Sequence, residues 1–186
     1  MIRAFIAVNL APAVGEEIAK VQASLKAVQG DIRWTRIEGM HLTLKFLGDI
    51  AREQVEPILA ALQSALHNQP PLHVMAQGLG AFPHLKRPRV LWVGLSGEGL
   101  TKLQEKVESA LIALDFPREE RSFTPHLTLG RVRSLRGWEQ VLTVVKKYEQ
   151  VQFGDSIIDR VTLYQSTLRP DGAVYSPLGT VSLQQA

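Results

Sequence analysis

A repeated tetrapeptide constrains the fold of this chain more than any other feature of its sequence. The residues HLTL begin at His41 and again at His126, in equivalent places of the two halves. Each copy precedes a glycine and a stretch with a helical pattern, and histidine is otherwise scarce, with five in 186 residues. The repeat therefore predicts a duplicated unit, in which each half supplies one strand to a shared site.

The spacing within each copy has a geometric meaning. Side chains at positions i and i+2 of a β-strand point to the same face of the sheet. His41 therefore shares a face with Thr43, and His126 with Thr128, while the leucines of each copy supply the buried face. The same alternation assigns Phe46 to the buried face. In a helix the imidazole and the hydroxyl would point about 200° apart, so the pattern favours two strands.

An imidazole beside a hydroxyl, present twice, suits the cleavage of a phosphodiester. Histidine titrates near neutrality, so one copy can be neutral while the other is protonated. In-line attack on phosphorus needs a base on the incoming oxygen and an acid on the departing oxygen. Other chemistries have weaker support, because the chain has no cysteine, no G-x-S-x-G motif, and no carboxylates beside the histidines to complete a metal site.

Length and composition are those of one globular domain, and we interpret residues 1–186 as a single domain of two related, interleaved lobes. The net charge of +3 is too small to indicate nucleic-acid binding, although residues 121–136 hold four arginines and no acid. Asn9 and Pro12 interrupt the apolar start, which is atypical of a secretory signal, and no stretch approaches the roughly 20 apolar residues of a membrane span. We expect a cytoplasmic monomer that does not contact membranes.

Hydrophobic periodicity predicts strands and helices that intermix along the chain. Strands are expected at 2–9, 41–47, 72–77, 89–95, 125–129, 157–163 and 174–178, and helices at 12–30, 55–66, 100–114 and 138–148. Pro170, Asp171 and Gly172 are typical of a turn. The short return between residues 72 and 95 favours antiparallel pairing, so we expect an α+β fold rather than a doubly wound parallel sheet.

The two motifs and their flanks resemble the 2H phosphoesterase superfamily, which is named for two H-x-[T/S]-x motifs. Within it the chain is most similar to the RNA 2′,3′-cyclic phosphodiesterase branch of the LigT type, historically called 2′-5′ RNA ligase. The resemblance extends over nearly the whole chain and rests on RAFIAV at 3–8, RW at 33–34, HLTLKFLG at 41–48, PRVLWVGL at 88–95 and FTPHLTLGR at 123–131.

This resemblance implies a bilobal fold with pseudo-twofold symmetry, in which two antiparallel sheets face each other across a central cleft and helices lie outside. It also implies hydrolysis of a terminal RNA 2′,3′-cyclic phosphate to a 2′-phosphate, with no metal and no other cofactor. In that family pattern His41 is the proton donor to the leaving 3′ oxygen, and His126 is the proton acceptor from water. Thr43, Thr128 and Arg131 bind the substrate phosphate.

Phosphate binding by Arg131 requires an irregular strand. Strict alternation places this side chain on the face opposite His126, so a bulge or turn at Gly130 is needed to bring it back. Trp34 and Phe46 are candidate stacking surfaces for a terminal base, although the alternation favours packing in the core for Phe46. The loop at residues 84–89, with three basic side chains, either contacts RNA or is an ordinary solvated loop.

Two other functions remain open from the sequence. The same site could catalyse the reverse reaction and join RNA ends through a 2′-5′ linkage, because microscopic reversibility allows it. A non-catalytic module would bind RNA ends in the same place, although binding alone does not need two titrating groups. The RNA itself is also open among tRNA fragments, other RNA and small cyclic nucleotides.

Overall fold

The computed structural model of the chain describes residues 1–170 and 172–184. The strands in this part of the chain are β1 (Ile2–Val8), β2 (Ile32–Trp34), β3 (Leu42–Ile50), β4 (Leu72–Phe82), β5 (Val90–Ser96), β6 (His126–Val132), β7 (Gln152–Ile158), β8 (Arg160–Arg169) and β9 (Gly172–Ser182). The α-helices are α1 (Pro12–Ala27), α2 (Val55–Ala65), α3 (Leu100–Leu111) and α4 (Trp138–Lys147). Single turns of 3-10 helix are η1 (Ile37–Gly39), η2 (Arg52–Gln54) and η3 (Ile112–Leu114).

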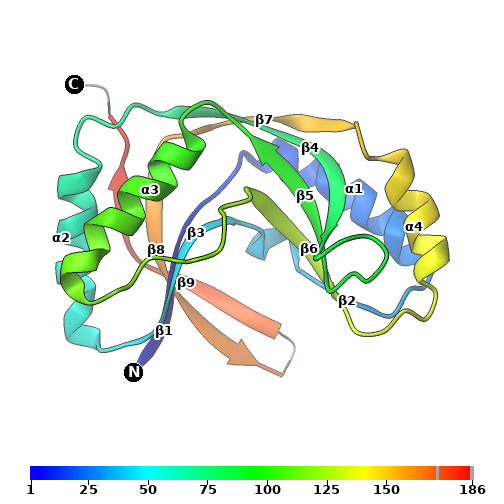
Figure 1. Cartoon of the computed structure of the whole chain (residues 1–186), viewed down its shortest axis with the longest axis horizontal. Helices are drawn as coiled ribbons and strands as arrows, with labels where there is room; N and C mark the ends of the chain where they lie inside the picture. Colours follow the sequence, from blue (N-terminus) through cyan, green and yellow to red (C-terminus); the bar gives the residue numbers. More distant parts are fainter. Residues whose placement is uncertain (171, 185–186) are drawn as a thin grey trace.

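The strands form two antiparallel sheets with helices on the outside, so the predicted α+β class is confirmed (Figure 1). Sheet A has the strand order β3-β1-β8-β9, and sheet B has the order β2-β6-β5-β4-β7. The first HLTL copy lies at an edge of sheet A, and the second lies inside sheet B, between β2 and β5. Each sheet therefore carries one copy of the repeat.

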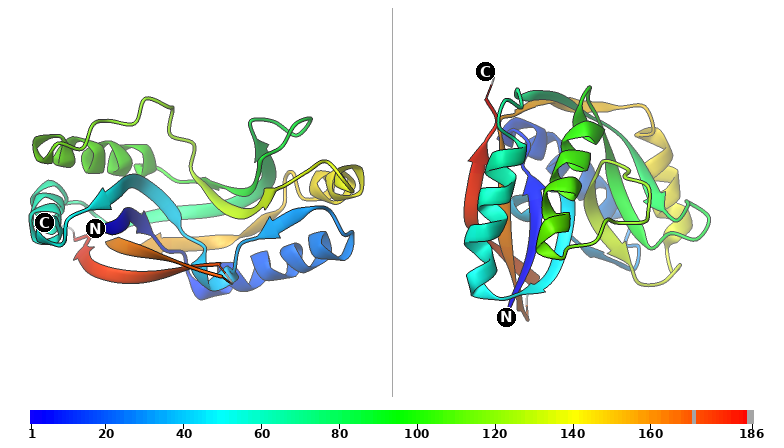
Figure 2. Two further views of the ribbon diagram at one scale, coloured as in Figure 1. Left: turned by 90° about the horizontal axis from the view of Figure 1, so that it is seen from below. Right: turned by 60° about the vertical axis from the view of Figure 1, so that its left-hand side comes forward.

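The two halves of the chain are interlocked. Strand β4 from the first half joins sheet B, whereas β8 and β9 from the second half return to sheet A. Helix α1 follows a strand of sheet A but packs against β7 of sheet B and against α4, while α3 follows a strand of sheet B but packs against β3 of sheet A and against α2. The two pairs of helices lie at opposite ends of the molecule (Figures 1 and 2).

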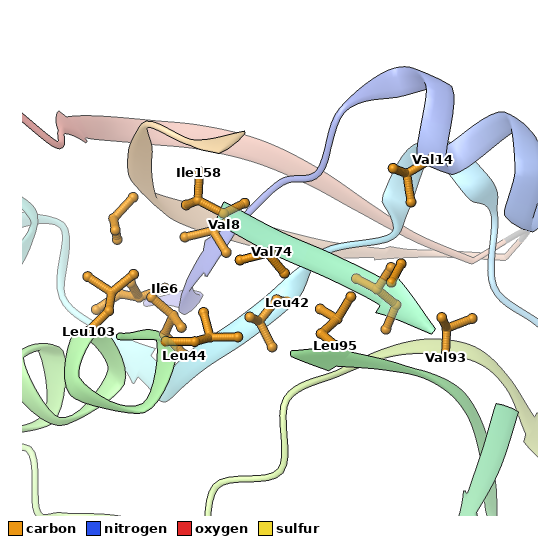
Figure 3. Close-up of a cluster of buried hydrophobic side chains, with 14 of the residues drawn as sticks. Ile6, Val8, Val14, Leu42, Leu44, Val74, Val93, Leu95, Leu103 and Ile158 are labelled. Carbon is orange, nitrogen blue, oxygen red and sulfur yellow. The ribbon is translucent and has the colours of Figure 1, made fainter. Parts of the chain in front are cut away.

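One continuous apolar cluster fills the space between the sheets and their helices. Figure 3 shows its centre, where side chains of β1, β3, β4, β5 and α3 meet. Ile6, Val74, Val93 and Leu103 are fully buried there, and removing such a side chain costs about 2–5 kcal/mol of unfolding free energy. Among the residues that the structure describes, none of the helices could span a lipid bilayer.

Most of the predicted strands and helices are confirmed, with ends that differ by a few residues. One prediction was wrong: residues 157–163 are not one strand, because the chain passes from β7 in sheet B to β8 in sheet A at Asp159. Strand β2 was missed because three residues are too few to show a period. His41 lies immediately before β3 rather than within it, and Asp171 of the expected turn lies outside the described residues.

Strand β3 has a bulge at the second leucine of HLTL. Thr43 and Lys45 pair with consecutive residues of β1, which leaves Leu44 as an extra residue. The bulge reverses the alternation beyond it, so Lys45 is turned inward and 6% exposed, whereas Phe46 is 70% exposed. The prediction that Phe46 packs in the core is therefore wrong, because it assumed an unbroken alternation.

Strand β6 has a bulge at the same position of the repeat. Thr128 and Gly130 pair with consecutive residues of β5, so Leu129 is the extra residue. Beyond the bulge Gly130 is buried and Arg131 is exposed. A β-carbon at position 130 would lie 2.7 Å from the Ile32 side chain, so glycine is required there. The duplication thus extends from the sequence to a matching irregularity of the backbone.

A buried ion pair connects the inward-turned Lys45 to α3. Its Nζ lies 2.5 Å from Oε2 of Glu108, and both side chains are 5% exposed. Lys45 also donates to the carbonyl of Pro117, and Gln104 donates to Oε1 of Glu108. The backbone N–H of Glu119 completes the network by donating to the same carboxylate. The pair therefore ties the first motif strand to the segment that leads toward the second.

Candidate active site

His41 is held by its own backbone and by aromatic rings. Its Nδ1 lies 2.8 Å from the carbonyl oxygen of Gly39, so Nδ1 carries the proton and donates it. The imidazole is stacked on Phe5 with ring centroids 4.6 Å apart, and Tyr175 meets it edge-on at 4.9 Å. Two sides of the ring are thus covered, and Nε2 is left as the nitrogen free to exchange a proton.

His126 is held in the same way from the other sheet. Its Nδ1 lies 2.7 Å from the carbonyl oxygen of Thr124, again two residues before the histidine. Phe82 meets the ring edge-on at 4.8 Å, and Trp92 lies 6.5 Å away. Both imidazoles therefore have the same tautomer, fixed by the same local hydrogen bond, and both present Nε2 for chemistry.

Burial makes both histidines weaker bases than usual. It lowers the pKa of His41 and of His126 below the ordinary value, because the charged imidazolium loses contact with water. The hydrogen bonds to Gly39 and Thr124 favour the charged form and oppose this effect, but they are the smaller cause. Both rings are therefore less readily protonated than an imidazole in water.

The strands that carry the histidines come together. β3 and β6 contact each other across the two sheets, near the centre of the molecule (Figure 1). Thr43 and Thr128 are half-buried and lie two residues after their histidines. Thr43 is paired with Ala7 of β1, and Thr128 is paired with Trp92 of β5. The structure thus places two imidazoles and two hydroxyls on neighbouring strands.

Each strand adds a third side chain beyond its bulge, and here the two copies differ. Phe46 and Arg131 occupy the same position, five residues after the histidine. Phe46 approaches Phe5, the ring under His41, at 6.2 Å, so it lies on the face of sheet A that carries the site. Arg131 is exposed and paired with Val90 and Arg33 of the flanking strands. Beyond its bulge, β3 therefore adds an aromatic side chain and β6 adds a cationic one.

Other candidate contacts are placed differently. Trp34 is paired with Gly130, and its ring lies against that glycine and the apolar core, so it does not share a face with Arg131. The loop at 84–89 is exposed at its basic residues. Of the four arginines between residues 121 and 136, Arg121 is paired with Glu119 at 3.0 Å.

Sequence reasoning missed the aromatic residues that enclose the histidines. Phe5 lies in a continuous apolar run, RAFIAV, in which alternation cannot be read. Tyr175 is far from His41 in sequence, and its contact arises because β9 pairs with β8 beside β1. Within the described residues, no three histidine, aspartate or glutamate side chains gather closely enough to ligate a metal ion.

A duplicated α+β fold that brings together two H-x-T-x motifs is the arrangement of the 2H phosphoesterases. Comparison with known families is more specific. The model of the LigT-like phosphoesterase family matches the chain twice, over residues 8–92 and 93–175, which divides it as the repeat does. The chain therefore belongs to the LigT-like phosphoesterase family.

Relatives and solved structures agree with this assignment. The chain is 34% identical to the RNA 2′,3′-cyclic phosphodiesterase of Aquifex aeolicus, over 95% of this chain and 94% of that protein. It is also 34% identical to the Archaeoglobus fulgidus enzyme of the same name, over 95% and 97%. A Thermus thermophilus crystal structure superposes with a TM-score of 0.82 at 27% identity, covering 98% of both chains. Escherichia coli LigT with 3′-AMP has the same fold, with a TM-score of 0.81 at 24% identity and 99% coverage of both chains.

Proposed function

We propose that this enzyme hydrolyses the 2′,3′-cyclic phosphate at the end of an RNA chain and leaves a 2′-phosphate, without a metal ion. The observation that carries the proposal is the pair of identically held imidazoles on two contacting strands. Neutral His126 removes a proton from water as the water oxygen bonds to phosphorus. Protonated His41 gives a proton to the 3′ oxygen as the P–O3′ bond breaks.

The remaining side chains support this assignment of roles. Negative charge grows on the non-bridging oxygens during attack, and fixed donors directed at them lower the barrier. Thr43 and Thr128 supply hydroxyl donors beside the histidines, and Arg131 supplies a permanent cation. Phe46, exposed beside Phe5, offers a flat apolar surface on which the terminal base can stack. The names of the Aquifex and Archaeoglobus relatives support cyclic-phosphate ends as the substrate.

The position of the phosphate in the product tests the direction of cleavage. An oligonucleotide ending in a 2′,3′-cyclic phosphate should be converted to the 2′-phosphate alone, which mass spectrometry combined with a 3′-specific phosphatase distinguishes from the 3′-phosphate. Hydrolysis in ¹⁸O-water should place one heavy oxygen on the phosphorus. A 3′-phosphate product would contradict the assigned leaving group. An unaltered substrate would contradict hydrolysis and favour the non-catalytic module that binds RNA ends.

The lowered pKa values of the two histidines predict a bell-shaped pH dependence. Activity is lost as pH falls because His126 becomes protonated, and it is lost as pH rises because His41 loses its proton. Since burial lowers both pKa values, the optimum of kcat/KM, which reports the free enzyme, should lie below about pH 6.5. A bound phosphate anion favours imidazolium, so the optimum of kcat should lie at higher pH. Steady-state rates between about pH 4.5 and about pH 9 test this, and a flat profile contradicts it.

A further inference from the structure

Two arginines lie side by side next to the site, on neighbouring strands. Arg33 of β2 is directly opposite Arg131 of β6, and both are exposed. Directly opposed residues of an antiparallel pair share a face, with β-carbons about 5 Å apart, and like charges in this position repel each other. The pair therefore costs folding free energy unless an anion binds between the two guanidinium groups.

Among the described residues, no carboxylate neutralises this pair. Within residues 1–170 and 172–184, neither Arg33 nor Arg131 has an ion pair or a side-chain hydrogen bond. Asp31, the acid nearest to Arg33 in sequence, accepts a hydrogen bond from Ser134 at 2.6 Å instead. The two guanidinium groups are thus available to an external anion.

Further positive charge lies at the same end of sheet B. The loop between β4 and β5 carries Lys86, Arg87 and Arg89, all exposed and without an acidic partner in the described chain. The loop is fixed at two points. Trp138 donates its indole N–H to the Leu85 carbonyl at 2.8 Å, and the N–H of Val132, one residue after Arg131, donates to the Arg89 carbonyl at 2.9 Å. The basic loop is therefore held beside the arginine pair.

The arginine pair also lies in line with the site. Arg131 is three residues after Thr128 on β6, which at the rise of a strand is roughly 7–10 Å, with the bulge between them. A phosphate one nucleotide away from a phosphate bound at Thr128 would thus lie within reach of the long arginine side chains. An RNA chain presents phosphates at such intervals, whereas a cyclic mononucleotide with a free 5′-hydroxyl has only one.

We propose that Arg33, together with the basic loop at residues 84–89, binds the phosphate on the 5′ side of the terminal nucleotide, while Arg131 lies between this phosphate and the one bound at the histidines. The preferred substrate is then an oligonucleotide rather than a cyclic mononucleotide. This inference rests on the proposed function for the identity of the group bound at the histidines. Arg33 itself is a specificity residue and takes no part in proton transfer.

The test measures binding, so it does not depend on turnover. A 5′-fluorescein-labelled adenosine trinucleotide with a 2′-phosphate end is titrated at several salt concentrations, with unlabelled 2′-AMP as a competitor. Arg33→Gln should raise the trinucleotide Kd about tenfold and leave the 2′-AMP Kd much less affected. The slope of log K against log salt should become shallower by about 0.7, as expected for one lost phosphate contact. Arg33→Lys should restore most of that slope.

Arg52→Gln is the matched control, since Arg52 is exposed and lies at η2, before α2. It should match wild type for both ligands. An unchanged trinucleotide Kd in Arg33→Gln would overturn the proposal, and so would equal weakening of both ligands, which would place Arg33 at the terminal phosphate. A wild-type protein that shows the salt slope but hydrolyses no cyclic phosphate would refute the proposed function and leave this subsite standing.

Discussion

Replacing either His41 or His126 by alanine should lower kcat by about a thousandfold on an oligonucleotide with a 2′,3′-cyclic phosphate end. Each variant removes one proton transfer, and a positioned acid or base contributes about 10²–10⁴-fold to the rate. The double variant should be scarcely slower than either single variant, because the two groups act together. KM should change little in all three, since the threonines and Arg131 remain.

The matched control is His67→Ala, because His67 is an exposed histidine next to the end of α2 and outside the site. Its kcat should equal that of the wild type. The pH profiles of the single variants add a second test: His126→Ala should lose the acidic limb of the bell, and His41→Ala should lose the basic limb. If both variants lost the same limb, the acid and base roles would have to be reassigned.

Glu108→Gln should lower the free energy of unfolding by about 3 kcal/mol. The substitution keeps the shape of the side chain but leaves the Lys45 ammonium, 5% exposed, without a negative partner. Removing one member of a buried ion pair typically costs 3–5 kcal/mol, because the other charge stays out of water. Urea unfolding followed by circular dichroism measures the loss as a lower midpoint at unchanged slope.

The control for this prediction is the double variant Lys45→Met with Glu108→Leu. Replacing both charges by apolar groups of similar size removes the buried charge altogether, so most of the stability should return. If the Glu108→Gln variant were as stable as the wild type, water would have to reach Lys45, and the ion pair would not stabilise the fold. If the double variant were less stable than the single one, the loss of the hydrogen bonds to the Pro117 carbonyl and from the Gln104 amide would outweigh the removal of the buried charge.

The sequence was sufficient for the features that depend on local spacing. The HLTL repeat predicted two related strands, although His41 lies just before β3 rather than in it, and hydrophobic periodicity located the four α-helices of the described residues. The same reasoning failed at Phe46, because the bulge at Leu44 is set by pairing with β1, which lies more than 30 residues earlier. Lys45 was overlooked for the same reason, as its partner Glu108 is on a distant helix.

Arg131 and Arg33 show which features of the site the local sequence can predict and which it cannot. The need for a bulge before Arg131 followed from alternation alone, and a shift of register is found there. Nothing in the local sequence indicates that Arg33 belongs next to it, since the pairing joins segments almost 100 residues apart. A strand of three residues such as β2 is too short to show an alternation of apolar and polar side chains. Its position in the sheet, and therefore its pairing partner, is known only from the three-dimensional structure.

The exchange of helices and strands between the two halves has a consequence for how this enzyme forms. Neither half can complete its share of the core without the other, because α1 and α3 each pack against a strand from the other half of the chain. We therefore expect the two imidazoles to reach their mutual positions in the same step that closes the core. Such an architecture disfavours a folding intermediate in which one lobe is complete and only half of the active site is formed.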